Sequence, residues 1–510
     1  MTDGMRGIVP PETWTVRRRR RRRRLVVLGA VLVLIGSGIW GGVTLLSVCG
    51  SFGSGVTELD GECVGVTDGS YVFHSDLADV QGKLEEENAR VRREAPAYVT
   101  VALLDPLTPS DDSGLPIAQV RNRLEGAYTA LRRVNTEPVS GDPNPQIELV
   151  LANSGTSDEH SRRVVEQLVD LRDQENPLVA VIGLGVSTER TKWQAEQLSA
   201  NDIPMVGAYL TADDLEYEHI PGLIKTSPSN RHYVEALRRH ADAAGIDSTI
   251  MVRDANSDSG ADLYTRSLEE EFERQMAEIM EFPTQQFTGS TGGAGGDVNL
   301  FGNVRANICA SAAQRLQAVL FAGREVDLGA FIESLEFRTC ADTPLVILTA
   351  GLELGALLKG QEDQLAEAKI TVLSASTVDA EGWRANPAAE GTPEHYGDFR
   401  RAFQLAQFAE EHLDDGGAIM MHDALLTAAQ AVRIAAPLGS ASAPTADDVR
   451  AQLLNINTLY SVQGASGELS FSKQATGAGT PLGKPVPVLA YPRAPGSPSR
   501  QTGELYHVTG

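Results

Sequence analysis

Residues 179–211 read VAVIGLGVSTERTKWQAEQLSANDIPMVGAYLT. Two runs of apolar residues, at 178–185 and 203–210, flank a more polar segment at 188–198 that has helical composition. This order predicts a strand, a helix and a second strand. Runs that are almost entirely Val, Ile and Leu are typical of parallel strands whose two faces are both covered by helices. The segment therefore predicts an α/β fold with a buried parallel sheet.

The same alternation continues on both sides of this segment. Runs similar to it predict further strands at 98–107, 147–155, 248–255, 278–282, 318–325, 344–351 and 370–377, and helices at 116–135, 159–174, 261–277, 311–316 and 418–436. We expect two open sheets, with the chain returning to the first lobe from residue 370 onward. A proline-rich tail from Lys484 is expected to be extended or disordered.

The amino terminus has the features of a membrane anchor. Residues 25–48 contain no charged side chain, and 24 helical residues exceed the hydrocarbon core of roughly 30 Å. Eight arginines, Arg17 to Arg24, precede the segment, which places residues 1–24 in the cytoplasm and the remainder outside it. We expect an uncleaved, single-pass signal anchor in the cell membrane. The alternatives are a cleaved secretory signal and a lipoprotein signal ending at Cys49, which Val48 does not favour.

Charge and cysteine content exclude several classes of protein. The net charge is -24, yet residues 1–24 carry nine arginines against two acids, so the remainder carries -31. Such an acidic surface repels phosphate backbones and argues against nucleic-acid binding. The four cysteines lack C-x-x-C spacing, which excludes zinc-ribbon and thioredoxin-like sites. If the bulk lies outside the cytoplasm, the expected disulfide pairs are Cys49 with Cys63 and Cys309 with Cys340.

Residues 49–97 are interpreted as a juxtamembrane linker followed by an amphipathic helix. Leu77, Val80, Leu84 and Val91 share one helical face. A dimerising stalk is the alternative, but Glu87 occupies one of its core positions, which favours docking on the domain that follows.

The common catalytic motifs are missing. The chain has no G-x-x-x-x-G-K-[ST], G-x-S-x-G or H-E-x-x-H pattern, and GLGVST (183–188) lacks the last glycine of a dinucleotide fingerprint. His422 beside Asp423 lies in an apolar helical pattern, where a packed, hydrogen-bonded histidine is expected. We therefore predict a protein that is not an enzyme and that uses no cofactor or metal.

Four phrases, in their order along the chain, resemble the type 1 periplasmic-binding fold, in particular the solute-binding proteins of branched-chain amino acid ABC transporters. They are residues 179–211; GLIKTSPSN (222–230); MVRDANSDSGADLYTRSL (251–268); and MMHDALLTAAQAVRIA (420–435) with TADDVRAQLLN (445–455) and GASGELSFS (464–472). The resemblance spans residues 98–491. It implies two Rossmann-like lobes joined by three crossings, with hinge closure around a solute.

The resemblance also implies domain boundaries. Lobe 1 is expected at about 98–226 plus 370–457, and lobe 2 at about 231–369 plus 458–483, followed by a tail at 492–510.

The candidate ligand contacts follow predicted strands of both lobes. In lobe 1 they are Ser187, Thr188, Ala208, Tyr209 and Thr211; in lobe 2 they are Asn256, Ser257, Ser259 and Glu325. Ser187 and Thr188 precede a helix, so their hydroxyls and free N–H groups suit a carboxylate, although either residue is equally well interpreted as a simple N-cap. Glu325 suits a ligand ammonium, and an exposed Arg324–Glu325 ion pair is the alternative.

These features predict a membrane-anchored, extracytoplasmic binding protein for an amino acid or a related small polar ligand. It would act in ABC-type uptake with a permease, or in sensing with a signalling partner. The alternative is a surface sensor or interaction protein whose ligand cleft is degenerate.

Overall fold

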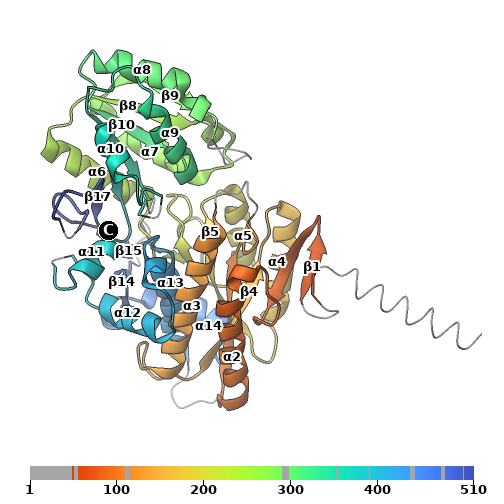
Figure 1. The fold of residues 1–510 in the computed structure, drawn as a ribbon. Helices are drawn as coiled ribbons and strands as arrows, with labels where there is room; N and C mark the ends of the chain where they lie inside the picture. Colours follow the sequence, from red (N-terminus) through yellow and green to blue (C-terminus); the bar gives the residue numbers. More distant parts are fainter. Residues whose placement is uncertain are drawn as a thin grey trace, which may run out of the picture.

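The protein folds into two α/β lobes, each built around one sheet (Figure 1). The structure is a computed structural model that describes residues 49–50, 55–109, 115–289, 298–351, 354–355, 357–389, 391–436, 443–472, 477–497 and 499–509. Lobe 1 contains a seven-stranded sheet in the order β1-β2-β4-β3-β5-β6-β7, and lobe 2 a six-stranded sheet in the order β17-β12-β11-β10-β8-β9.

Both sheets are parallel except at one edge. In lobe 1 the hairpin β1-β2 runs antiparallel to β4, and in lobe 2 β17 runs antiparallel to β12. The elements of lobe 1 are β1 (Val56–Leu59), β2 (Glu62–Thr67), α2 (Ala78–Glu94), β3 (Tyr98–Asp105), α3 (Ile117–Thr136), β4 (Gln146–Asn153), α4 (Asp158–Leu171), β5 (Leu178–Val186), α5 (Glu189–Ala200), β6 (Met205–Tyr209), β7 (Leu223–Lys225), α11 (Ala380–Ala385), α12 (Tyr396–Leu405), α13 (Gly417–Ala435), α14 (Ala446–Arg450), β13 (Val462–Gly464), β14 (Gly467–Phe471) and β15 (Pro481–Leu482). Those of lobe 2 are α6 (Asn230–Ala244), β8 (Thr249–Asp254), α7 (Leu263–Met276), β9 (Met280–Phe287), α8 (Gly302–Ala312), β10 (Ala318–Ala322), α9 (Glu325–Glu336), β11 (Leu345–Ala350), α10 (Glu362–Glu367), β12 (Ile370–Ala375), β16 (Pro485–Val486), β17 (Val488–Tyr491) and β18 (Tyr506–His507).

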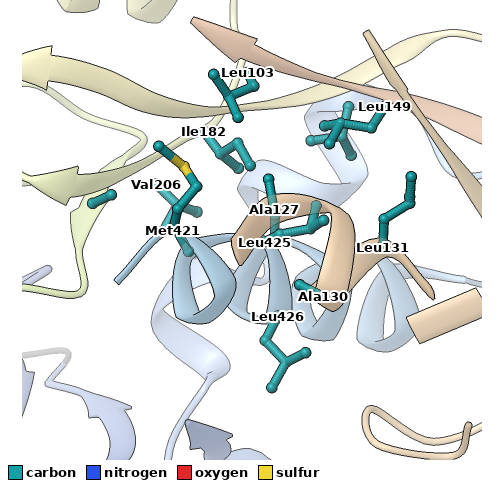
Figure 2. Close-up of a cluster of buried hydrophobic side chains, with 14 of the residues drawn as sticks. Leu103, Ala127, Ala130, Leu131, Leu149, Ile182, Val206, Met421, Leu425 and Leu426 are labelled. Atoms are coloured by element: carbon teal, nitrogen blue, oxygen red, sulfur yellow. The ribbon is translucent and has the colours of Figure 1, made fainter. Parts of the chain in front are cut away.

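Helices cover both faces of the sheet in lobe 1. Helices α2, α3 and α13 pack on one face and α4 and α5 on the other. Figure 2 shows Met421 and Leu425 of α13 directed toward Leu103, Ile182 and Val206 of the strands. The fold class expected from the Val-, Ile- and Leu-rich runs is therefore confirmed, because strands buried on both faces need apolar side chains on both faces.

Helices α3 and α13 approach each other most closely at Gly126, and this contact carries a prediction. A Cβ at position 126 would lie 2.6 Å from the carbonyl carbon of Ala418, which is backbone and cannot rotate away. Gly126→Ala should therefore lower the free energy of unfolding by about 1–3 kcal/mol through overpacking. Gly82→Ala is the matched control, since a Cβ there meets nothing within 4 Å and alanine should stabilise α2 by about 0.5–1 kcal/mol. Urea unfolding of both variants would measure the difference, and equal effects would contradict the packing argument.

The segment before residue 98 is part of lobe 1 and not a linker, which corrects the expected boundary. Strand β2 pairs with β4, so the hairpin extends the sheet by two strands. Helix α2 docks as predicted, with Val80, Leu84 and Val91 buried. Glu87 is buried too, and its charge is neutralised by Arg90 at 2.6 Å and by Arg132. Glu87 can therefore occupy a core position of α2 because its charge is paired with two arginines, one of which, Arg132, lies on α3.

Three short segments connect the lobes: residues 226–229, 376–379 and 483–484. Their positions correct the expected lobe boundaries. Strand β12 belongs to the lobe 2 sheet, where it pairs with β11, so the chain returns to lobe 1 only after residue 375. Residues 462–472 and 477–482 belong to lobe 1, because Leu469 and Phe471 join the core that contains α13 and β15 pairs with β14.

The carboxyl-terminal tail is ordered in the described part, contrary to the expectation. Strand β18 pairs with β16, and Tyr506 and Val508 are buried in the lobe 2 core. Pro485 is the first residue of β16, a position where a proline is compatible with an edge strand. The predicted helix at 311–316 is also wrong, because α8 ends at Ala312 and Arg315 adopts a left-handed φ of 73°.

Two disulfides join Cys49 to Cys63 and Cys309 to Cys340, the pairs expected from the sequence. The predicted membrane span, 25–48, lies outside the described residues. Within the described ranges, no helix combines the length and apolar character needed to cross a bilayer.

Candidate functional site

A cavity of about 810 Å³ lies between the lobes, at the carboxyl ends of the parallel strands. Lobe 1 contributes the ends of β3, β5 and β6, through Asp105, Val186 and Tyr209. Lobe 2 contributes Glu325 after β10 and Gly351 after β11. Loops at the carboxyl ends of open parallel sheets are where α/β folds bind ligands, because helix N-termini and free backbone groups converge there.

Ser187 and Thr188 line the cavity as predicted, but the side-chain oxygen of each already accepts hydrogen bonds from backbone N–H groups of the protein. The Oγ of Ser187 accepts from the N–H groups of Thr211, at 3.0 Å, and Ala212, at 3.2 Å. Thr188 is the N-cap of α5 and accepts from the N–H of Thr191. The N-cap interpretation therefore holds for Thr188, while Ser187 fixes the loop that follows β6.

The backbone around Ser187 also joins the two lobes. Its carbonyl oxygen accepts from the N–H of Tyr264 at 3.2 Å and from Nη2 of Arg324 at 3.1 Å, both in lobe 2. The N–H of Glu189 donates to the carbonyl of Ala261 at 3.2 Å. The lobes are thus in contact at one end of the cavity, as in a closed arrangement.

Of the three residues predicted at the end of the next strand, two line the cavity and one does not. Tyr209 and Thr211 line the cavity, whereas the side chain of Ala208 is buried in the lobe 1 core and faces away from it. Tyr209 donates a hydrogen bond to the carbonyl of Gly417, and its ring lies 4.2 Å from the guanidinium of Arg123. Tyr209 is therefore a wall of the cavity, held in place by α13 and α3.

Asn256, Ser257 and Ser259 do not line the cavity. They form a 3₁₀ turn, η2 (Ala255–Ser259), whose polar side chains bind the lobe itself. Ser257 donates to Glu269 at 2.8 Å, and the amide of Asn256 donates to the carbonyl of Gly289 at 2.9 Å. The three residues do follow a strand, as predicted, but that strand is β8. The loop that brings Glu325 to the cavity follows the neighbouring strand, β10.

Arg324 and Glu325 are not an ion pair with each other. Arg324 forms two hydrogen bonds of 2.7 Å with the carboxylate of Asp262 and lies 5.0 Å from the ring of Tyr264. Glu325 lines the cavity, and a hydrogen bond with Gln119 of α3 reaches it from the opposite lobe.

Asp105, Gln119, Arg123 and Asp415 are among the cavity residues that were not identified from the sequence. Asp105 and Arg123 form a buried ion pair at 3.0 Å. Asp415 is 8% exposed and accepts from Asn122 at 2.6 Å and from the N–H of Gly417 at 2.8 Å. Gln119 and Arg123 share a face of an ordinary amphipathic helix, and Asp415 lies in a DDGG turn, so no sequence signal distinguished them.

Burial has a marked effect on the cavity carboxylates. It raises the pKa of Glu325 to about 7, and the nearby charge of Asp415 acts in the same direction. Burial also raises the pKa of Asp415, against the opposing effect of its hydrogen bonds and of Arg123. Loss of hydration inside the cavity is the main cause of both shifts, because burial disfavours the charged form of a carboxylate.

Glu325→Gln should change how stability depends on pH. Since the pKa of Glu325 is about 7 in the folded chain and ordinarily 4.5, the folded state binds more protons than the unfolded state between these values. Wild-type stability therefore loses a contribution as pH rises through that window. The melting temperature of the full-length variant, minus that of the wild type, should increase from about pH 4.5 to about pH 7. Asp213 and His232 titrate in both proteins and cancel in the difference, so parallel pH profiles would contradict the assignment.

The cavity extends beyond the interlobe space along lobe 1. This outer arm is lined by Ser154, Thr156, Arg162, Arg190 and Trp193. Arg162 lies 5.8 Å from the ring of Trp193, and Arg190 pairs with Asp158 at 3.0 Å. No cluster of three or more His, Cys, Asp or Glu among the described residues is arranged to hold a metal ion.

Two α/β lobes, three connecting segments and a cavity at the strand ends define the type 1 periplasmic-binding fold, which agrees with the resemblance seen in the sequence. Solved structures with this fold include a leucine-bound ABC transporter substrate-binding protein from Desulfitobacterium hafniense, which is 15% identical, with a TM-score of 0.54 over 81% of this chain and 100% of that one. The leucine-binding protein LivK from Thermotoga maritima is also 15% identical, with a TM-score of 0.55 over 81% of this chain and 98% of that one.

A third similar structure is a solute-binding protein of Rhodopseudomonas palustris in complex with 3,4-dihydroxybenzoic acid. It is 12% identical, with a TM-score of 0.58 over 80% of this chain and 97% of that one. No family model matches the chain, and no curated protein matches its sequence. The neighbours are described as binding proteins and not as enzymes, in agreement with the lack of catalytic motifs in this sequence.

Proposed function

We propose that the chain is a solute-binding protein that captures an amino acid or a related small polar molecule between its lobes. The observation that carries the proposal is the cavity of about 810 Å³, which is lined by charged and hydroxyl side chains from both lobes. Its size lies within the range of sites for small molecules, about 300–1,000 Å³. A ligand that touches both lobes favours closure over opening, and this differential binding is what a receptor or a permease can detect.

The proposal includes a location. Residues 25–48 would anchor the chain in the cell membrane, with the lobes outside the cytoplasm, and the two disulfides support an oxidising compartment. An ABC permease or a signalling partner would then receive the loaded protein. Protease added to intact cells should digest residues 49–510 and spare the amino terminus, and protection of the lobes would contradict this orientation.

Thermal melting of the full-length protein against a panel of small solutes tests the binding function. A ligand of the folded state raises the melting temperature, with a stabilisation equal to RT ln(1 + [L]/Kd). The panel should contain neutral, acidic and basic amino acids, alkyl amines and aromatic acids. Stabilisation by any member at concentrations near its Kd supports the function. No shift with any of them would favour the rival, an interaction protein with a degenerate cleft.

A further inference from the structure

The cations that face the space between the lobes are already neutralised. Arg123 is paired with Asp105 at 3.0 Å, and Arg324 with Asp262 at 2.7 Å. In both pairs the carboxylate is fully buried, so its removal from the guanidinium would leave an uncompensated buried charge. The charge of each arginine is therefore already balanced by a buried aspartate before a ligand enters.

The backbone donors near this space are committed as well. The N–H groups of Thr211 and Ala212 donate to Ser187, and the N–H of Glu189 donates to the carbonyl of Ala261. The N–H of Thr191 donates to the Thr188 hydroxyl. These four N–H groups already donate within the protein, so they are not available to a ligand carboxylate at the start of α5.

Two carboxylates remain without a cationic partner. Within the described residues, neither Glu325 of lobe 2 nor Asp415 of lobe 1 has a basic nitrogen within 4.0 Å, although both line the cavity. They accept hydrogen bonds only from neutral groups, namely Gln119, Asn122 and the N–H of Gly417. With each arginine balanced by its own aspartate, these two carboxylates leave the space between the lobes with a charge of -2 when both are ionised.

We propose that this cleft selects a cationic organic amine, such as an alkyl diamine or a basic amino acid, whose ammonium groups bind Glu325 and Asp415. This inference rests on the proposed binding function and names the class of ligand. Because the two carboxylates belong to opposite lobes, an ammonium between them replaces mutual repulsion with attraction and favours closure. Burial raises the pKa of both carboxylates, and the charge of Asp415 adds to this effect at Glu325.

The test measures the affinity of the full-length protein by isothermal titration for 1,4-diaminobutane, 1,5-diaminopentane, L-lysine, L-leucine and 3,4-dihydroxybenzoate. We expect the amines and lysine to bind at least about 10-fold more tightly than leucine or the aromatic acid, since a charge-assisted contact discriminates by that order. Asp415→Asn and Glu325→Gln should each weaken amine binding by about 10- to 100-fold and change the binding of 3,4-dihydroxybenzoate, which carries no ammonium, by less than about 3-fold.

Asp173→Asn is the matched control, because it removes the same charge from a side chain that is 87% exposed and lies outside the cavity lining. It should leave all affinities unchanged, and melting curves confirm that each variant is folded. Tighter binding of leucine or dihydroxybenzoate than of the amines would overturn this inference and leave the proposed function intact. Binding of none of the five solutes would overturn both this inference and the proposed function. An equal loss of amine affinity in Asp173→Asn would overturn this inference, because it would show that only the overall charge of the protein matters.

Discussion

Lys225→Met should lower the free energy of unfolding by about 3–5 kcal/mol, as expected when one partner of a buried ion pair is removed. The side chain of Lys225 is 0% exposed and that of Glu216 is 2% exposed, with 3.5 Å between Nζ and the nearest carboxylate oxygen. The ammonium also donates to the hydroxyl of Ser229 at 2.7 Å and to the carbonyl of Ala212 at 3.2 Å. Without it, these acceptors remain buried next to the first segment that connects the lobes.

A second lysine–aspartate ion pair, which is partly exposed, supplies the control for Lys225→Met. Lys192 pairs with Asp214 at 3.3 Å, but its side chain is 28% exposed, so Lys192→Met should cost only about 0–1 kcal/mol. Urea unfolding of the full-length proteins measures both. The double variant Lys225→Met, Glu216→Gln should recover part of the loss, because the buried charge is then absent. Equal costs for Lys225→Met and Lys192→Met would show that burial does not decide the effect.

Asp262→Asn should cost about 2–4 kcal/mol, because it breaks a two-fold hydrogen-bonded pair and weakens the cap of a helix. Asp262 is fully buried, receives both Nε and Nη2 of Arg324 at 2.7 Å, and accepts from the N–H of Thr265 at the start of α7. The substitution also leaves the guanidinium of Arg324 without its counter-charge in the cavity. Binding of a cationic ligand should therefore weaken, in addition to the loss of stability.

Asp258→Asn tests whether burial is responsible. Asp258 also pairs with an arginine, Arg253, at 2.8 Å, but its side chain is 64% exposed. The free energy of unfolding should change far less than for Asp262→Asn, and the affinity for amines should not change. A loss of stability at position 258 comparable to that at 262 would contradict the explanation.

The regular parts of the fold were predictable because local pattern decides them. The runs that became β3, β4, β5 and β8 are rich in aliphatic residues, as expected of strands covered on both faces. The edges were not predictable in this way. Hairpin β1-β2 and strands β16 to β18 contain only two to six residues each, too few for a sequence pattern to show, and they are strands because an existing sheet edge or core accepts them.

The site was predictable at strand ends and not elsewhere. Thr188, Tyr209 and Glu325 line the cavity because the ends of parallel strands meet at one edge. Ala208 was misplaced because it lies inside β6 with its side chain toward the lobe 1 core, and Asn256 because its 3₁₀ turn directs the side chain into lobe 2. Arg123 lies on a helix and Asp415 in a turn before another helix, and only packing α3 against α13 brings them to the cleft.

Alternating apolar and amphipathic segments determined by themselves that this chain forms parallel sheets covered by helices. The two cysteine pairs were expected on the condition that the bulk of the chain lies outside the cytoplasm. Which charges meet was decided by the tertiary structure alone. Arg123 finds Asp105, Arg324 finds Asp262, and Glu325 faces Asp415 across the lobes without a cation. The physical reason is that an ion pair depends on distance in space, and residues 325 and 415 become neighbours only when both lobes have folded and met.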